Sequence, residues 1–168
     1  MVNQAPLLSA SQAVSLGADA RSYLMCRSGR SLGALPLEQV VETMRPLPVE
    51  SVPDMPPYLL GLAMIRGQAT PVLHLGRLLG QGRDIPSGRF VRLQCGTYRY
   101  ALAVDEVLGL RSLAVDEQLT LPPLLKACRG HGVDGIGALD QALLLMLQSA
   151  CLLPQELAQR LESQESAA

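Results

Sequence analysis

The stretch GRSLGALPLEQVV at residues 29–41 returns in altered form as GTYRYALAVDEVL at residues 96–108. A shift of 67 residues places Ala34 on Ala101, Leu35 on Leu102 and Val40 on Val107. Each copy carries an apolar strand pattern on both sides of a glycine turn, followed by an acidic residue and a valine. The chain therefore contains a strand-rich unit that occurs twice.

A second pair of segments repeats at a slightly different spacing. A shift of 74 residues places Gly61 on Gly135 and Leu73 on Leu147. The repeated unit spans only about 60 residues, a length at which a chain buries too little surface to hold a large core alone. We therefore expect two small pseudo-symmetric barrels that share one core, with a groove between them.

Short apolar runs bounded by Gly and Pro indicate strands at many points along the chain. The predicted strands are Tyr23–Arg27, Ser31–Leu37, Gly61–Arg66, Ala69–Leu75, Phe90–Gln94, Tyr98–Val104, Val107–Leu113 and Ala142–Leu147. The predicted helices are a turn at Leu75–Leu79, a short helix at Leu121–Arg129 and an amphipathic C-terminal helix at Pro154–Leu161. The leucine stripe of that last helix is expected to pack onto the last barrel. The fold class is mainly β, with a few short helices.

The 168 residues suit one folded domain. We expect a flexible leader at 1–20, a single domain at 21–162 and a disordered tail at 163–168. The two barrel subdomains are expected to be formed approximately by 21–87 and 88–153, with strand exchange between them allowed.

Composition excludes several classes of protein. Formal net charge is −1 and no basic cluster appears along the sequence, which argues against nucleic-acid binding. The four cysteines form no C-x-x-C pair, so we expect reduced thiols in a cytoplasmic protein. The longest strongly apolar run, Ala142–Leu147, is far shorter than the ~20 residues of a membrane span, so no direct membrane insertion is expected.

Two enzymatic motifs occur in an unsuitable context. Gly29–Gly33 matches G-x-S-x-G, and Ser31, Asp105 and His131 follow the chain order of a serine hydrolase. That motif needs a strand that enters a helix, whereas here a hairpin joins two strands, so a small serine hydrolase is only the alternative function. Gly130–Gly135 matches G-x-G-x-x-G but leads into an apolar strand instead of a helix, which predicts no cofactor.

The histidines do not indicate a metal site. His74 alternates with apolar neighbours on a predicted strand, and His131 lies in the glycine-rich loop. Neither has a Cys or an acidic residue at ligand spacing. We expect no metal and no catalytic residues.

Four stretches, in order, resemble one known family. Gly33–Glu42 is similar to Y-x-L-P-[IL]-x-x-V-x-E, and Pro56–Leu75 (PPYLLGLAMIRGQATPVLHL) resembles a pattern that contains N-[LI]-R-G and P-[VI]-[IVL]-D-L. Leu102–Asp105 resembles G-[IL]-x-V-D, and Gly135-Ile-Gly resembles the family's closing motif. Over residues 21–153 the chain resembles the CheW-like domain family, the adaptors of bacterial chemosensory arrays.

The resemblance implies two five-stranded SH3-like barrels packed pseudo-symmetrically around a shared core. It implies a non-catalytic adaptor whose partners are a chemoreceptor cytoplasmic helix bundle and a histidine kinase regulatory domain of the same CheW-like fold. The sequence departs from the family pattern at three positions: Gly33 replaces an aromatic residue, Met64 an Asn and His74 an Asp. A regulatory domain broken from a larger kinase is a further alternative.

The resemblance also indicates four candidate partner contacts: Val40, Glu42, Arg66 and Phe90. Val40 and Phe90 either line the groove between the barrels or belong to the core, because apolar strand residues are usually buried. Glu42 and Arg66 either meet partner charges or pair with each other.

Overall fold

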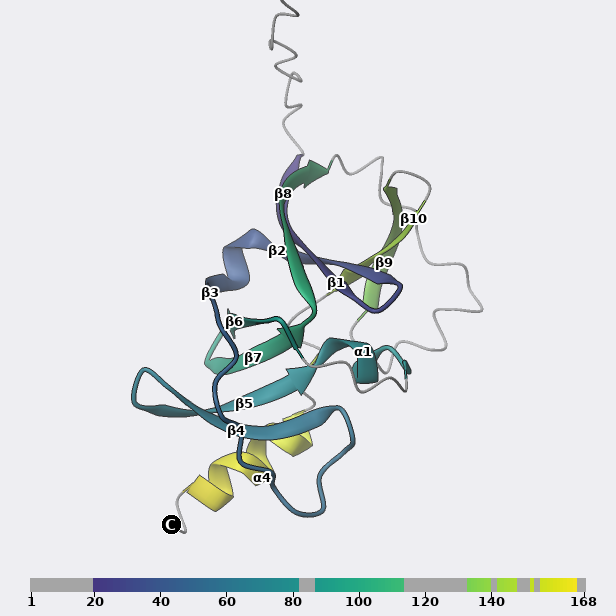
Figure 1. The fold of residues 1–168 in the computed structure, drawn as a ribbon. Helices are drawn as coiled ribbons and strands as arrows, with labels where there is room; N and C mark the ends of the chain where they lie inside the picture. The colour runs from purple at the N-terminus through teal and green to yellow at the C-terminus, as the bar shows by residue number, and fades with distance from the viewer. Residues whose placement is uncertain are drawn as a thin grey trace, which may run out of the picture.

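The computed structural model describes residues 20–81, 87–113, 133–139, 142–147, 152 and 155–165, and these form two five-stranded sheets (Figure 1). Sheet A has the order β8 (Glu106–Leu113), β1 (Arg21–Ser28), β2 (Ser31–Pro36), β10 (Ala142–Leu147) and β9 (Val133–Leu139). Sheet B has the order β3 (Val40–Met44), β6 (Arg89–Cys95), β7 (Tyr98–Val104), β5 (Gln68–His74) and β4 (Leu59–Ile65). The described helices are η1 (Leu37–Gln39), α1 (Leu75–Leu78) and α4 (Gln155–Glu165).

All eight predicted strands are present, with ends that differ by at most two residues from the prediction. β3 was not predicted, because it is short and carries Glu42 and Thr43 between its apolar residues, so no clear alternation marks it. The predicted helix at Leu121–Arg129 lies outside the described residues.

The duplication is confirmed by the strand register. Cys26 of β1 pairs with Gly33 of β2. The residues 67 positions further along the chain, Leu93 of β6 and Tyr100 of β7, pair with each other in the same way. A β-bulge interrupts the pairing of β1 with β8 next to Cys26, whose partner is Val107. A matching bulge interrupts the pairing of β3 with β6, next to the pair Val40 and Leu93. The two sheets are thus built to one plan, down to their irregularities.

Each sheet combines strands from both repeats. Sheet A takes β1 and β2 from the first repeat and β8, β9 and β10 from the second, while sheet B has the opposite composition. Each sheet contains one parallel pair of strands, β2 with β10 in sheet A and β5 with β7 in sheet B. η1 contacts both β1 and β6, and directly after it β3 enters sheet B. The repeats at 21–87 and 88–153 are therefore interlocked.

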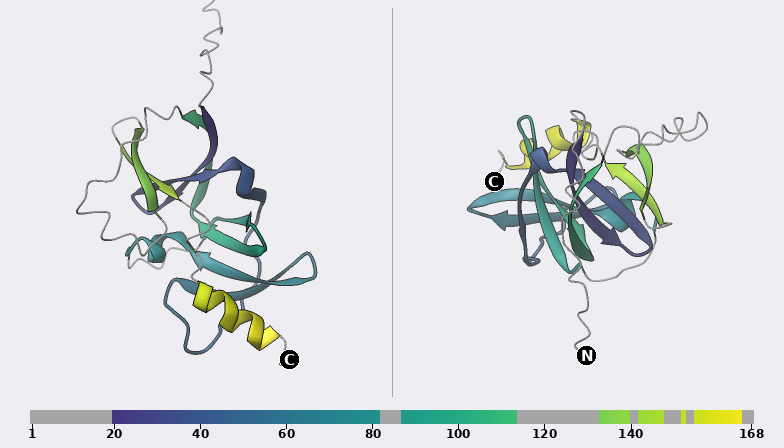
Figure 2. Two further views of the ribbon diagram at one scale, coloured as in Figure 1. Left: turned by 180° about the vertical axis from the view of Figure 1, so that it is seen from behind. Right: turned by 90° about the horizontal axis from the view of Figure 1, so that it is seen from above.

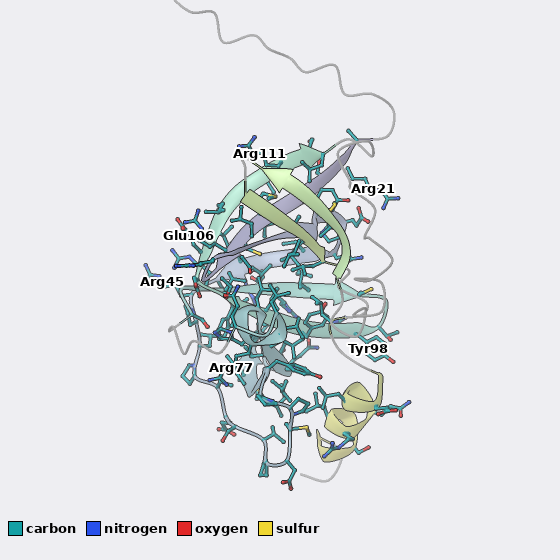
Figure 3. The ribbon with its side chains drawn as sticks, turned by 90° about the vertical axis from the view of Figure 1, so that its right-hand side faces the viewer. Arg21, Arg45, Arg77, Tyr98, Glu106 and Arg111 are labelled. Atoms are coloured by element: carbon teal, nitrogen blue, oxygen red, sulfur yellow. The ribbon has the colours of Figure 1, made fainter. Side chains whose placement is uncertain are left out.

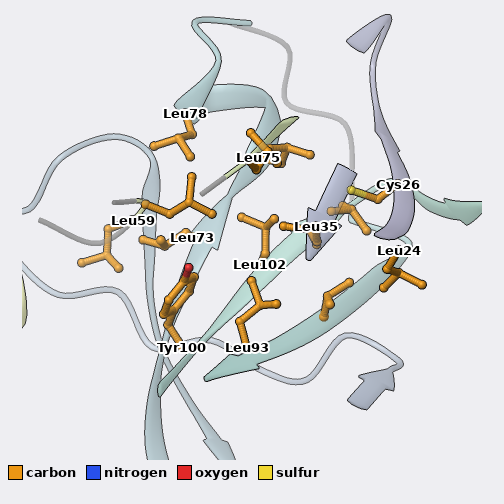
Figure 4. Packing of buried hydrophobic residues seen from close by; sticks show 14 of the residues in the cluster. Leu24, Cys26, Leu35, Leu59, Leu73, Leu75, Leu78, Leu93, Tyr100 and Leu102 are labelled. Atoms are coloured by element: carbon orange, nitrogen blue, oxygen red, sulfur yellow. The ribbon is translucent and has the colours of Figure 1, made fainter. Parts of the chain in front are cut away.

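Both faces of β1, β2 and β7 are buried along most of each strand, which explains their continuous apolar runs. Successive residues of β7 alternate between two clusters: Tyr100 and Leu102 belong to one, Ala101 and Ala103 to another. The first cluster is the shared layer, to which both sheets contribute (Figure 4). Each sheet has in addition its own smaller cluster, around Tyr23 and Met25 in sheet A and around Phe90 and Ile65 in sheet B.

The C-terminal helix α4 lies beside β4 and β5 of sheet B (Figures 1 and 2). Its Leu157 and Leu161 are buried in the shared layer, and Arg160 donates a hydrogen bond to the carbonyl of Asp54 (3.4 Å). The leucine stripe thus packs into the layer that both sheets share, so its contact is not confined to one barrel. α4 also continues to Glu165, beyond the predicted end of the folded part at 162.

Leu35 and Leu102 occupy equivalent positions in the two repeats, and both are 0% exposed. We expect Leu35→Ala and Leu102→Ala each to lower the free energy of unfolding by about 2–5 kcal/mol, through lost burial and a residual cavity. Urea denaturation measures this directly. Leu110→Ala, at a residue that is 60% exposed, is the control and should shift stability by less than about 0.5 kcal/mol. Unchanged urea midpoints for both core variants would contradict the shared layer.

Candidate interaction surface

One end of sheet B carries a cluster of charged and polar side chains from four strands and from the β4–β5 turn. Glu42 on β3 accepts hydrogen bonds from Arg66 (Nη2–Oε2 2.7 Å, Nε–Oε1 3.3 Å) and from Arg92 on β6 (Nη1–Oε1 3.1 Å). Gln68 on β5 accepts from Arg92 (3.4 Å) and from Arg99 on β7 (3.1 Å). We call these five residues the arginine cluster.

Sheet register brings the arginine cluster together. Glu42 is the direct cross-strand partner of Arg92, so their side chains lie on the same face. Arg92 follows Phe90 by two positions and Arg99 precedes Ala101 by two, so both arginines share the face of sheet B that carries the Phe90 cluster. The arginine cluster therefore closes one end of that apolar cluster.

Arg66 is held in the tight turn between β4 and β5. Ile65 pairs with Gln68, which leaves Arg66 and Gly67 as a two-residue turn with φ angles of 53° and 75°. Positive φ at both central residues is typical of type I′ hairpin turns, which favour Asn, Asp and Gly. An arginine is less favourable there, and its two hydrogen bonds to Glu42 offset that backbone preference.

The electrostatics of the arginine cluster favour the ionised carboxylate. Hydrogen bonds from Arg66, and then from Arg92, lower the pKa of Glu42 below its ordinary value. Reciprocally, the hydrogen bonds to Glu42 raise the pKa of the Arg66 guanidinium. The side chain of Arg66 is nevertheless 71% exposed, whereas those of Glu42 and Arg92 are 23% and 13% exposed. Arg66 is thus both paired and accessible.

The four residues indicated by the resemblance have different environments. Glu42 and Arg66 pair with each other, and Val40 is partly buried against the shared layer, opposite Leu93. Phe90 is only 2% exposed and lies in the core of sheet B, as its counterpart Tyr23 lies in that of sheet A. The interpretation of Phe90 as a partner contact is therefore corrected: its ring is a core side chain.

Sequence reasoning missed Arg92, Arg99 and Gln68. The run FVRL at 90–93 contained one signal, since a charged residue inside an apolar strand needs a partner when it is half-buried. Of the other described arginines, Arg21 and Arg111 lie on neighbouring strands of sheet A, and Arg45 follows β3 (Figure 3). The arginines of the cluster are far apart in the sequence and meet only in the fold, so the sequence showed no basic cluster.

The three departures from the family pattern fit the fold locally. A Cβ at Gly33 would lie 3.0 Å from Leu147 and 3.3 Å from the sulfur of Cys26, so the space of an aromatic ring is already filled. Met64 is 65% exposed, and packing does not constrain it. His74 accepts a hydrogen bond at Nδ1 from the backbone N–H of Arg77 (3.2 Å), which makes it the N-cap of α1. An aspartate caps helices in the same way.

The serine hydrolase alternative finds no support in the contacts of its residues. Ser31 accepts a hydrogen bond from the amide of Gln81, and Asp105 accepts one from the backbone N–H of Gly29 (2.6 Å). Asp105 also donates its own N–H to the carbonyl of Arg27 (2.9 Å). Both side chains therefore anchor the β1–β2 turn, and His131 lies outside the described residues.

Other chemistry is limited in the part of the chain that the structure describes. Burial raises the pKa of the Cys26 thiol to about 12, so this thiol stays protonated. Three or more His, Cys, Asp or Glu side chains do not gather as a metal site anywhere in the described ranges. Among the same residues, no helix has the length and apolar character to cross a bilayer.

Comparisons with known proteins agree with this architecture. A sequence profile of the CheW-like domain matches residues 22–156. Protein FrzA of Myxococcus xanthus is 34% identical to this chain over 114 residues, a match that covers 65% of this chain and 71% of that protein. The crystal structure of the scaffolding protein TtCheW from Thermoanaerobacter tengcongensis has a similar fold, with a TM-score of 0.68, 20% identity, and coverage of 77% of this chain and 89% of that one. The structural likeness confirms the predicted two-barrel fold.

Stability should depend on pH through Glu42. Its pKa in the folded state lies below the ordinary value of 4.5, so its contribution is fully present above that value and is lost as pH falls through the lowered folded-state value. We expect the difference in unfolding free energy between wild type and Glu42→Gln to be constant near neutral pH and to shrink below about pH 4.5. Urea titrations from about pH 7 to about pH 3 measure it, and a constant difference would contradict the pairing.

The capping role of His74 gives a second prediction. His74→Asp keeps an acceptor for the N–H of Arg77, whereas His74→Ala removes it, so the Ala variant should be less stable than the Asp variant by about 1 kcal/mol. Both variants lose the imidazole ring, so their difference in urea midpoint isolates the cap. Equal midpoints would show that His74 acts through packing alone.

Proposed function

The chain belongs to the CheW-like domain family, and we propose that it couples chemoreceptors to a histidine kinase in a bacterial chemosensory array. Members of this family are scaffold or adaptor proteins of chemotaxis signalling and are not enzymes. The proposed partners are the cytoplasmic helix bundle of a chemoreceptor and the regulatory domain of the kinase, which has the same fold. This role places the chain in the cytoplasm.

The observation that carries the proposal is the two-barrel fold with an exposed ionic surface and no assembled catalytic group in the described residues. An adaptor needs stable surfaces that present fixed side chains, and the continuous core beneath both sheets provides them. Ser31 and Asp105, the described members of the hydrolase alternative, are engaged in turn contacts.

We place the partner contact at Val40, Glu42 and Arg66. Arg66 is exposed and held at a hairpin tip, and Val40 lies at the β3 bulge beside Glu42. Arginine is enriched at binding hot spots because its planar guanidinium makes several directed hydrogen bonds. Val41 adjoins these residues and is 50% exposed, which supplies an apolar component next to the charges.

Reconstitution tests the proposed function. Purified chain is mixed with the kinase and with receptor cytoplasmic fragments from the same organism, and binding and kinase autophosphorylation are measured. We expect the chain to bind both partners and to make kinase activity depend on the receptor fragment. Binding to neither partner would contradict the adaptor role. A different outcome would favour the alternative of a regulatory domain broken from a larger kinase. In that case the chain binds the receptor fragment alone, and phosphotransfer is restored when separate kinase catalytic domains are added.

Arg66→Ala tests the placement of the contact. We expect about tenfold weaker association with the receptor fragment or the kinase, because the change removes an exposed hydrogen-bonding group from the interface. The urea midpoint should shift little, since an exposed ion pair contributes little to stability. Arg30→Ala, at an exposed arginine of the β1–β2 turn, is the matched control. Unchanged affinity with lowered stability would show that Arg66 serves only to hold Glu42.

A further inference from the structure

We propose that the arginine cluster of sheet B receives an acidic segment of a partner protein. The inference rests on the proposed adaptor function, because it specifies the chemistry of the surface that an adaptor would bind there. It concerns Arg66, Arg92 and Arg99 acting together, with Glu42 and Gln68 as the groups that position them.

The charge balance of the arginine cluster is the first support. Arg66 and Arg92 contact Glu42, and Arg99 reaches the same network through Gln68. Two guanidinium groups contact the single carboxylate and a third joins the cluster through Gln68, so this surface has a local excess of positive charge on a chain whose net charge is −1. A guanidinium matches a carboxylate in two parallel hydrogen bonds, so partner Asp or Glu side chains complement this surface.

Accessibility is the second support. The side chain of Arg66 is 71% exposed, and Arg99 and Gln68 are also exposed. A guanidinium has five N–H donors, and Arg66 uses Nε and Nη2 on Glu42. Arg66 and Arg99 can therefore contact an incoming carboxylate without first leaving Glu42 and Gln68.

The pseudo-symmetry of the fold supplies the third support. The residues of sheet A that correspond to Glu42, Arg92 and Arg99 are Gly109, Met25 and Leu32. Met25 and Leu32 are buried in the apolar cluster of sheet A. Equivalent positions thus carry apolar side chains in sheet A and charged side chains in sheet B. Folding does not require ions at this place, so the arginine cluster calls for a role outside the fold.

A protein partner fits the arginine cluster better than a nucleic acid or a lipid surface. Binding to phosphate backbones or anionic lipids is driven by an extended basic field. Among the described residues, Arg21 and Arg111 lie on sheet A, Arg45 follows β3 (Figure 3), and Arg27 forms an ion pair with Glu106 (3.3 Å). A small cluster with directed donors suits one or two carboxylates of a folded partner.

The test uses two labelled helical peptides that differ only in the sign of the charged face, one with Glu and one with Lys. Fluorescence anisotropy measures their binding to wild type, Arg99→Gln, Glu42→Gln and the control Arg30→Gln. We expect the Glu peptide to bind in preference to the Lys peptide, with affinity that falls as salt is added. Arg99→Gln should weaken binding about two- to fivefold, and the control should not.

Glu42→Gln gives the sharpest outcome. It keeps an oxygen acceptor for Arg66 and Arg92 but removes the internal negative charge, so affinity for the Glu peptide should rise about two- to fivefold. A fall in affinity, a preference for the Lys peptide, or no binding of either peptide would overturn the proposal. Arginine-dependent binding to phosphatidylserine vesicles without binding to the Glu peptide would also overturn it.

The same variants separate this inference from the adaptor function. If wild type and the double variant Arg66→Gln/Arg99→Gln bind the receptor fragment and the kinase equally well, the adaptor role stands and the acidic docking surface is wrong. If wild type binds neither partner but discriminates between the peptides as expected, the adaptor role is wrong and the surface stands. Urea midpoints of all variants confirm that the compared proteins are folded.

Discussion

The shared apolar layer between the two sheets is the contact on which the rest of the structure depends. Strands of both sheets direct alternate residues into it, including Leu35 of the first repeat and Leu102 of the second (Figure 4). The helix α4 adds Leu157 and Leu161. Removed from this layer, each sheet would expose one apolar face. A unit of one repeat buries too little surface to hold a large core, so we expect each copy to depend on the other for its stability.

The interlocking of the repeats builds the charged surface as well as the core. Because β3 leaves its own repeat and pairs with β6, Glu42 of the first repeat lies beside Arg92 of the second. Arg66 and Gln68 come from the first repeat, while Arg99 comes from the second. The arginine cluster therefore exists only in the assembled fold, and anything that loosened the strand exchange would also disperse it.

The departures from the family pattern show how a fixed architecture absorbs local change. At Gly33, Leu147 and Cys26 fill the room that an aromatic ring would take, while at the equivalent position Tyr100 is fully buried. At His74, an imidazole nitrogen performs the capping that a carboxylate oxygen can perform. These exchanges preserve the scaffold, and the third departure, Met64, lies at an exposed position.

The sequence by itself determined most of the strands, the duplication and the burial of Leu35 and Leu102. Periodicity and turn residues are local signals, and a repeat can be read by alignment of the chain with itself. The sequence also indicated the family, through motifs that follow one another in order. Only the tertiary structure decided that β3, β4 and β5 form one sheet with β6 and β7, and that α4 packs on sheet B. It also decided that Phe90 is core and that Arg92 and Arg99 join one cluster with Glu42. These outcomes depend on which strand edges pair and in which register, and a shift of one residue would turn every side chain of a strand to the opposite face. That choice is made by contacts between residues far apart in the chain, which no local pattern contains.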